Sequence, residues 1–454
     1  ISLAVVTGNS YKLVFSWKSD ILDVVNPPAA IDQVSMISNP PRTFTSVASG
    51  NWNLPATWDI NAVPTSADNA IVSTGTTVTL NVNNLAINDL TINGTLNYAT
   101  AAATFAVKGN LLVNTGGNLD AFAGTTGKSL VVSRNLTNNG NIDLSKGTAV
   151  NNILTFDGII PQTIGGTGTF TNNLIRNLTF NNSSTGVITW NFNDLRVGGN
   201  LTFTKGKVAL GSNTLILGTG VAAGTGNNAI GALVYTSGGF VSGTFSRWWA
   251  NTATGTALTA GSQPTAALGR YPFISSSGIN RAAYVQRVTP TAGGQIACKY
   301  VDAATTSASS ISDSGYVLDS KYDGNWTFST PGTVPVSATY NIALIGQNAY
   351  LASNGNSRII RETAAVEGTH LNGTNLPMGQ RTGLTLAQLT QSPLYIGLAF
   401  ADTPNASIAS GNWNNAAIWS KGNVPNCNEI VSIAPNHTVS INSAGNSCKG
   451  LTVS

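Results

Sequence analysis

The sequence predicts an all-β protein built as a tandem array, in which a parallel β-solenoid with a tryptophan-motif cap alternates with β-sandwich modules. Three observations lead to this prediction. Between residues 67 and 220, short apolar runs are each closed by Asn or Gly, as strands separated by tight corners would be. Within that region Leu-Thr-Phe recurs at residues 154, 178 and 201, and the spacings of 24 and 23 residues suit one solenoid coil. A segment near residue 50 is also repeated near residue 411.

The repeat relates residues 49–93 to residues 410–454 at a constant offset of 361 residues. Ser-Gly-Asn-Trp-Asn begins both stretches, and Trp58 recurs as Trp419. Because no insertion is needed anywhere, both stretches are expected to share one backbone. The chain is expected to be a window onto a longer array of large modules.

The order of the patterns divides the chain into four segments. Apolar and polar residues alternate in the first forty residues, and the second apolar region has longer loops and more aromatic residues than the solenoid. Helix signals are weak, although residues 384–389 suit one helical turn. An all-antiparallel sandwich, the alternative to the solenoid, would instead show hairpins. The predicted segments are a β-sandwich end at 1–40, the Trp-motif cap and β-solenoid at 45–225, a β-sandwich at 230–403, and a second Trp-motif and solenoid start at 407–454.

Composition narrows the range of partners. Only 9% of residues are charged, whereas 42% are apolar, which is enough to bury large cores. The net charge of +4 comes from 22 Lys and Arg that form no dense patch, so nucleic acid is not an expected partner. No apolar run approaches the roughly 20 residues that cross a bilayer, so no transmembrane segment is expected in this window.

Two cysteines distinguish the second copy of the repeat from the first. Cys427 and Cys448 stand where the first copy has Ser66 and Ile87. A disulfide is the simplest interpretation, and closing a loop of this size contributes about 3 kcal/mol. Such a bond would indicate an oxidising, extracellular setting. The alternative is two buried free thiols, and Cys298 is expected to be a small core residue.

The tryptophans fall into two groups. Trp52 and Trp58, with their repeats Trp413 and Trp419, are interpreted as packing that covers the open first coil of a solenoid, rather than as a surface for sugar stacking.

The second group is Arg247-Trp248-Trp249, the candidate for contact with a glycan or a protein ligand. Neighbouring residues of a strand face opposite sides, so both indoles cannot easily enter one core. The preferred interpretation, however, is that these residues form the interface between the solenoid and the following sandwich, and contact with a ligand is the alternative.

Few residues in the sequence are candidates for catalysis. The spacings of Asp89, Asp120 and Asp143 would allow neighbouring coils, but these residues are interpreted as separate solvated aspartates in turns. His370 and His437 are both expected at the surface. No nucleophile elbow, phosphate loop or zinc motif occurs in a supporting context. The sequence therefore predicts no enzyme, no catalytic or metal-binding residues and no cofactor.

Three segments carry a family resemblance. They are the Ser-Gly-x-Trp…Trp…Val-Pro unit at 49–64 and 410–425, the run from Leu154 to Gly168 with its following Asn-Leu-Thr-Phe repeats, and residues 239–273. Together they resemble large secreted surface proteins of the Bacteroidota that leave the cell by type IX secretion, including gliding-motility adhesins.

The resemblance implies an extracellular, cell-surface protein that acts as a stalk and mediates attachment or surface motility. Its expected partners are glycan or protein ligands on a surface and the secretion or outer-membrane anchoring machinery. The alternative is a polysaccharide-binding or polysaccharide-degrading β-solenoid protein.

Overall fold

A computed structural model divides the chain into two units, Ile1–Pro41 and Arg42–Ser454, and the description below concerns the second. The predicted sandwich end at residues 1–40 lies outside the described residues, apart from Pro40. The structure describes residues 40–100, 104–121, 126–145, 152–221, 230–260, 262–265, 267–303, 305–313, 316–346, 357–371, 378–391, 393–398, 404–427 and 429–454.

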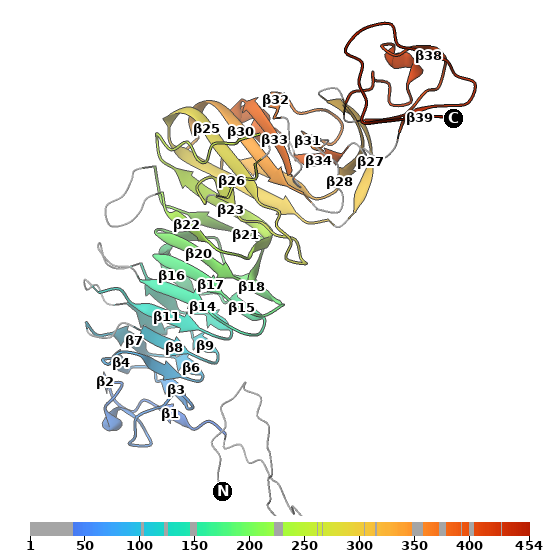
Figure 1. Ribbon diagram of the computed structural model, residues 1–454. Coiled ribbons are helices and arrows are strands. Elements are labelled where there is room, and N and C mark those ends of the chain that lie inside the picture. Colours follow the sequence, from blue (N-terminus) through green and yellow to red (C-terminus); the bar gives the residue numbers. More distant parts are fainter. Residues whose placement is uncertain are drawn as a thin grey trace, which may run out of the picture. The chain divides into compact units, whose positions relative to one another are not determined.

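The N-terminal part of this unit is a parallel β-solenoid, as predicted, with three ladders of strands (Figure 1). Each ladder takes one short strand from each successive coil. The first ladder contains β1 (Thr43–Thr45), β3 (Asn69–Val72), β6 (Leu90–Ile92), β9 (Leu111–Val113), β12 (Leu136–Asn138), β15 (Gln162–Gly165) and β18 (Val187–Asn191). The second contains β2 (Gly50–Asn51), β4 (Thr77–Leu80), β7 (Thr95–Tyr98), β10 (Asn118–Asp120), β13 (Asn141–Leu144), β16 (Thr169–Ile175) and β19 (Leu195–Val197). Both ladders continue into β21 (Lys207–Leu217) and then β23 (Gly239–Trp249).

The third ladder is a separate seven-stranded sheet. Its strands are β5 (Leu85–Ile87), β8 (Thr104–Val107), β11 (Ser129–Val132), β14 (Ile153–Phe156), β17 (Asn177–Asn181), β20 (Asn200–Lys205) and β22 (Ala232–Tyr235). Leu154 pairs with Leu178, and Leu178 pairs with Leu201, which confirms that one Leu-Thr-Phe repeat is one coil.

Alternation along each strand builds the core. In β14, Leu154 and Phe156 are fully buried, while Thr155 between them faces outward. Because the strands pair in register, like side chains stack on like. The ring centroids of Phe156 and Phe180 are 6.1 Å apart, and those of Phe180 and Phe203 are 5.0 Å apart. The inner face is therefore a continuous apolar column.

The solenoid joins the following region through a shared strand. β23 is parallel to β21 on one side and antiparallel to β26 (Gly294–Val301) on the other, and β26 pairs with β29 (Asn325–Ser329). The predicted border at residues 225–230 thus precedes two strands, β22 and β23, that still pair with the solenoid. One cluster of buried residues extends from Phe44 to Leu398.

Residues 270–398 form antiparallel sheets. One contains β24 (Arg270–Tyr271), β25 (Ala283–Ala292), β30 (Val336–Ile345), β33 (Met378–Leu384) and β32 (Thr369–His370). The other contains β27 (Thr306–Asp313), β28 (Tyr316–Tyr322), β34 (Tyr395–Leu398) and β31 (Ser357–Ile360). The predicted helical turn exists as α1 (Leu386–Thr390), which begins with a capping box between Thr385 and Gln388. No helix in the described ranges has the length and apolar character needed to cross a bilayer.

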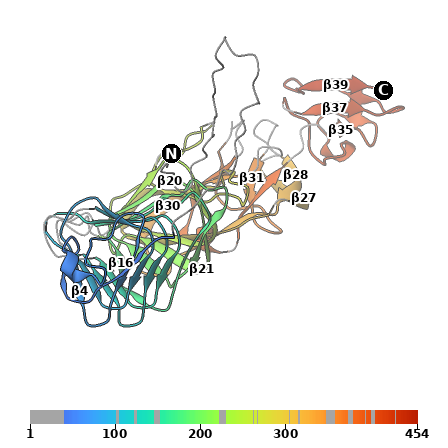
Figure 2. The same ribbon diagram turned by 90° about the horizontal axis from the view of Figure 1, so that it is seen from below.

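The second copy of the repeat folds like the first, with β35 (Asn405–Ala406), β36 (Gly411–Asn412), β37 (Ile430–Ile433), β38 (Val439–Ser440) and β39 (Gly450–Val453). Figure 2 shows β35, β37 and β39 side by side. Gly50 pairs with Val78, and at the offset of 361 Gly411 pairs with Val439. A short 3-10 helix occupies Pro55–Thr57 in one copy and Ala416–Ile418 in the other. The expectation of one shared backbone is confirmed for these elements, although β5 of the first copy has no counterpart strand in the second.

The two tryptophans of the motif pack against each other in both copies. The rings of Trp52 and Trp58 meet edge to face at 4.9 Å, and Trp58 Nε1 donates to the carbonyl oxygen of Trp52 at 2.9 Å. Trp413 and Trp419 repeat this arrangement. Their ring centroids are 5.1 Å apart, and Trp419 Nε1 donates to the carbonyl oxygen of Trp413 at 2.8 Å. In the first copy Trp52 also contacts Phe105 of β8, with ring centroids 5.3 Å apart.

Replacing Trp52 with Ala should lower the free energy of unfolding by about 3 to 5 kcal/mol, because a fully buried indole is removed and leaves a cavity. The measurement is urea unfolding followed by circular dichroism. The matched control is Val47→Ala in the same coil, where the side chain is 61% exposed and little should change. A loss below about 1 kcal/mol for Trp52→Ala would contradict its place in the core.

Candidate functional site

The predicted contact residues Arg247, Trp248 and Trp249 lie at the end of β23 and alternate in direction. Arg247 and Trp249 are 3% and 1% exposed, whereas Trp248 is partly exposed. Arg247 Nη1 donates to the carbonyl oxygens of Ala267 (3.0 Å) and Arg270 (3.1 Å), and burial lowers the pKa of its guanidinium. Of the three, only Trp248 can meet a ligand at the surface.

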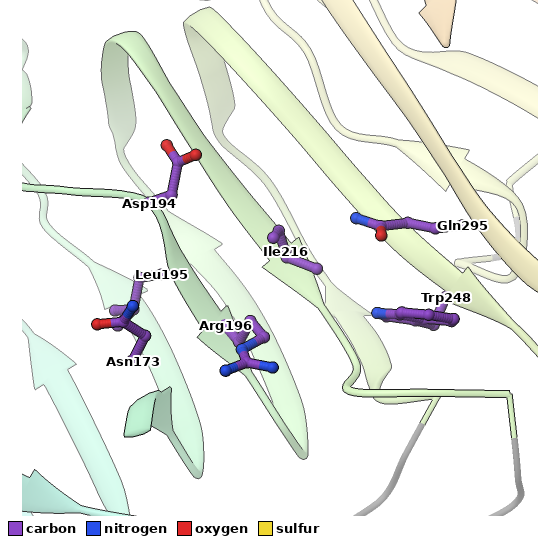
Figure 3. Close-up of a pocket in the computed structure, with 7 residues that line it drawn as sticks. All are labelled: Asn173, Asp194, Leu195, Arg196, Ile216, Trp248 and Gln295. Carbon is purple, nitrogen blue, oxygen red and sulfur yellow. The ribbon is translucent and has the colours of Figure 1, made fainter. Parts of the chain in front are cut away.

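Trp248 lines a hollow of about 280 Å³. Among the tryptophans in the described ranges, it alone is not buried. Figure 3 shows its indole and the side chain of Gln295 extending side by side. The full lining is Asn173, Asp194, Leu195, Arg196, Ile216, Trp248 and Gln295.

Strand pairing brings these residues together from distant parts of the sequence. Arg196 of β19 pairs with Ile216 of β21, which pairs with Ser246 of β23. Across the antiparallel junction, Trp248 pairs with Gln295 of β26. Gln295 is 6% exposed, and its Nε2 donates to Ser246 Oγ at 2.6 Å. The wall beside the indole is therefore held by a buried hydrogen bond.

A bulge in β16 forms the opposite edge of the hollow. The pairing of β16 with β13 shifts between Phe170 and Ile175, and the intervening Asn172 and Asn173 have φ values of 61° and 50°. Asn tolerates this left-handed backbone better than most residues, and bulges turn side chains toward new directions. Arg196 Nη2 donates to the carbonyl oxygen of Asn172 at 3.0 Å, which ties the bulge to β19.

The remaining polar group is Asp194, which precedes β19. Its Oδ1 accepts a hydrogen bond of 2.6 Å from the backbone N–H of Thr214. Asp194 and Arg196 thus each bind the backbone of a neighbouring strand. Chemically, the hollow offers one aromatic ring, an apolar floor, one carboxylate, one guanidinium and two amides.

Two of the three solenoid aspartates are not the separate turn residues that the spacing suggested. Asp120 of β10 and Asp143 of β13 are direct register partners on adjacent coils, so their Cα atoms are about 5 Å apart. Asp143 Oδ1 accepts hydrogen bonds from the N–H and Oγ of Ser145. Asp89 does lie in a turn, where its Oδ1 accepts from the backbone of Asn110. Within the described ranges, no three His, Cys, Asp or Glu side chains gather closely enough to hold a metal ion.

The surface prediction for His370 is wrong. His370 is 5% exposed, and neither ring nitrogen has a hydrogen-bond partner. Burial, followed by the nearby Arg358 guanidinium, lowers its pKa to about 4. The strand pairing places it opposite Arg381, a residue that also faces the core. His437 is half-buried in the second copy, and its Nδ1 lies 2.9 Å from Ser407 Oγ.

Cys427 and Cys448 are free thiols in the structure, the first exposed and the second half-buried. In sequence they flank a backbone link between their two segments, the 2.7 Å hydrogen bond from Lys449 N to Glu429 O. The structure contains no disulfide between them, and the bond remains a prediction for the oxidised protein. Cys298 is buried as expected, and burial raises the pKa of its thiol.

The sequence pointed to Trp248 but to none of the other residues of the hollow. Asn172-Asn173 inside a strand is a turn-type pair and is a signal for a bulge. Arg196, Ile216 and Gln295 carry no such signal, because their meeting depends on coil register. Comparison of the chain with protein-family models, with curated proteins and with solved structures finds no match.

The buried His370 should make stability depend on pH. Its folded pKa lies below the ordinary 6.5, so its contribution is complete above pH 6.5 and is lost as pH falls toward 4, by up to about 3 kcal/mol. His370→Phe should remove that part of the loss. The comparison is urea unfolding of both proteins between pH 7 and pH 4.5, with His437→Gln as the control. If the free energy of unfolding fell equally with pH in the parent and in His370→Phe, the assignment of this pH dependence to His370 would be refuted.

Purification without reductant should yield a Cys427–Cys448 disulfide, because a backbone hydrogen bond already joins the two segments. Peptide mapping by mass spectrometry should find these two cysteines linked and Cys298 reduced. Adding reductant should then lower the melting temperature, whereas a Cys427→Ser variant should not respond. Three titratable thiols in the denatured, non-reduced protein would exclude the bond.

Proposed function

We propose that this chain is a structural and adhesive part of a large extracellular cell-surface protein, in which it serves as a stalk and mediates attachment or surface motility. The observation that carries the proposal is the 18-stranded sheet, which continues through β23 from parallel coils into antiparallel strands. The apolar core is continuous across the same junction. A load applied to the solenoid would pass through hydrogen bonds and packed side chains, without a linker to extend.

The tryptophan motif acts in this proposal as a cap and start unit for each solenoid. The first coil has β1 and β2 but adds no strand to the seven-stranded sheet, which ends at β5. Trp52 instead packs on Phe105 of that sheet's face. In the second copy Trp413 and Trp419 remain buried although Leu451 and Val453 are 50% and 66% exposed. The motif therefore forms its own small core, which suits a unit used repeatedly in an array.

The antiparallel region following the solenoid serves in this proposal as a β-sandwich spacer. Extracellular display is supported by the low charge and the predicted cysteine pair, and by the resemblance to type IX secretion cargo. Surface glycans or proteins would be its ligands, and export and anchoring machinery its other partners.

A polysaccharide-binding or polysaccharide-degrading protein is the second candidate. The register pairing of Asp120 with Asp143 is the observation that favours a degrading activity, because carboxylates near one another are the usual acid–base pair of glycoside hydrolysis. On the stalk proposal these residues are structural, and the chain cleaves no polysaccharide.

Deletion of one complete coil distinguishes the stalk function from the polysaccharide-degrading function. Deleting residues 130–153 joins Ser129 to Leu154, and the fold should survive because Leu130 and Leu154 are register partners. A stalk shortened by one coil should still be displayed on unpermeabilised cells, where antibody labelling detects it, and should still support attachment. Circular dichroism and thermal melting of the purified variant check its folding.

The matched control removes residues 130–141, about half a coil, and should fail to fold because the ladders no longer align. The full-coil deletion also removes Asp143. If the parent releases oligosaccharides from a polysaccharide panel, and the folded deletion variant or Asp120→Asn/Asp143→Asn does not, the degrading function replaces the stalk.

A further inference from the structure

We propose that the hollow beside Trp248 is a binding subsite for a neutral glycan and accepts one pyranose ring of an uncharged chain. The inference rests on the adhesive part of the proposed function and gives it a ligand class and a place. It follows from the exposure of the indole, the charges of the lining, and the way the walls are held.

The indole supplies the main contact surface. Every other tryptophan in the described ranges is buried, so the position of Trp248 at the surface is an exception that packing does not explain. A flat, partly apolar indole matches the C–H face of a sugar ring, and its N–H can still reach a hydroxyl. Ile216 forms an apolar floor next to it, whereas the side chain of Leu195 is buried in the core.

The polar lining selects for a ligand without net charge. Asp194 brings one negative charge and Arg196 one positive charge, and the amides of Asn173 and Gln295 are neutral. Sugar hydroxyls both donate and accept hydrogen bonds. A carboxylate, a guanidinium and an amide together can satisfy both roles. A uronate would be attracted by Arg196 and repelled by Asp194, and an amino sugar the reverse, so the lining gives neither charge a net electrostatic gain to offset its desolvation.

The walls are set before a ligand arrives. The hydrogen bond from Gln295 to Ser246 fixes the residue paired with Trp248. Hydrogen bonds to backbone atoms hold Arg196 and Asp194 in place. Asn172 and Asn173 keep two consecutive left-handed conformations, a strained arrangement that proteins retain most often where it positions a functional group. Pre-set walls reduce the entropy lost on binding.

The size of the hollow limits the ligand. A volume of about 280 Å³ is near the lower end for small-molecule sites and suits one ring. Only one strand, β21, lies between β19, which carries Arg196, and β23, which carries Trp248, so the two strands are about 10 Å apart across the sheet. The hollow is open, so a chain of sugars can continue over the solenoid surface on either side.

Isothermal titration calorimetry of the whole chain tests the proposal with cellohexaose, xylohexaose and mannohexaose as neutral probes and hexagalacturonic acid as the acidic probe. At least one neutral hexaose should bind, and Trp248→Ala should weaken it at least tenfold. Trp248→Phe keeps a ring and should weaken it less. Arg196→Gln and Asp194→Asn should each weaken it several-fold, with circular dichroism confirming that every variant is folded.

The control is Val234→Ala, which removes an exposed side chain from β22 in the other sheet and should leave affinity unchanged. Binding that survives Trp248→Ala, stronger binding of hexagalacturonic acid, or no binding of any neutral hexaose would each overturn the site. Glycan affinity is measured on the full-length chain, so these outcomes are read separately from the coil deletion, which removes β13, the pairing partner of the bulged β16, and tests the stalk.

Discussion

Backbone hydrogen bonding between register-matched positions of successive coils is the constraint on which the rest of this structure depends. A strand of three or four residues has no stability alone, but each strand inside a ladder is paired on both sides by equivalent strands of the coils before and after it. Register then decides which side chains form the core, because a slip of one residue would exchange Leu154 and Phe156 for Thr155 on the inner face.

On the outside of the solenoid, the same register aligns asparagines of successive coils. Asn114 donates to Asn93 at 2.7 Å, and Asn141 donates to Asn118 at 2.9 Å. Side-chain amides thus repeat the coil spacing that the backbone sets.

A stack of this kind has to be closed at its ends, and the chain uses two different solutions. At the start, the first coil adds no strand to the seven-stranded sheet, and the buried pair Trp52 and Trp58 is proposed to cover the open end. At the other end, β23 accepts an antiparallel partner, and the aromatic column continues across the change of direction. Phe203 meets Phe240 at 5.0 Å, Phe245 meets Tyr271 at 5.8 Å, and Tyr271 meets Phe328 at 5.8 Å. The second solution leaves no open edge in the joined ladders, because β23 is paired on both sides, whereas the seven-stranded sheet ends at β22.

The features that the sequence predicted correctly are those that repeat. Leu-Thr-Phe at 154, 178 and 201 gave the coil length, and the offset of 361 gave the shared backbone of the two tryptophan motifs, because a repeat reports a recurring environment. A similar tripeptide, Leu90-Thr91-Ile92, belongs to the first ladder and not to the seven-stranded sheet. A match of three residues is therefore not enough to predict which ladder a strand joins. His370 was misplaced because a Gly- and Asn-rich neighbourhood suggested a loop, whereas this residue lies in a short strand, β32, that pairs with β33 at the edge of the sheet. The pairing of Asp120 with Asp143 was missed because irregular corner lengths hid a shared register.

The hollow beside Trp248 lies where the repeat breaks down, and this location has a physical reason. A regular solenoid face presents flat rows of side chains at fixed spacing, which offer no concavity. Concavity needs an interruption, and two interruptions meet here. The bulge in β16 moves Asn173 out of its row, and the change from parallel to antiparallel pairing at β23 places Gln295 beside an indole that has no counterpart one coil earlier.

Such interruptions cost stability, since they introduce left-handed backbone and lose ladder hydrogen bonds. The continuous core on either side supplies the stability that lets the chain retain them. In a protein whose other surfaces are set by repetition, a site for recognition is therefore most readily formed at the junction between two modules.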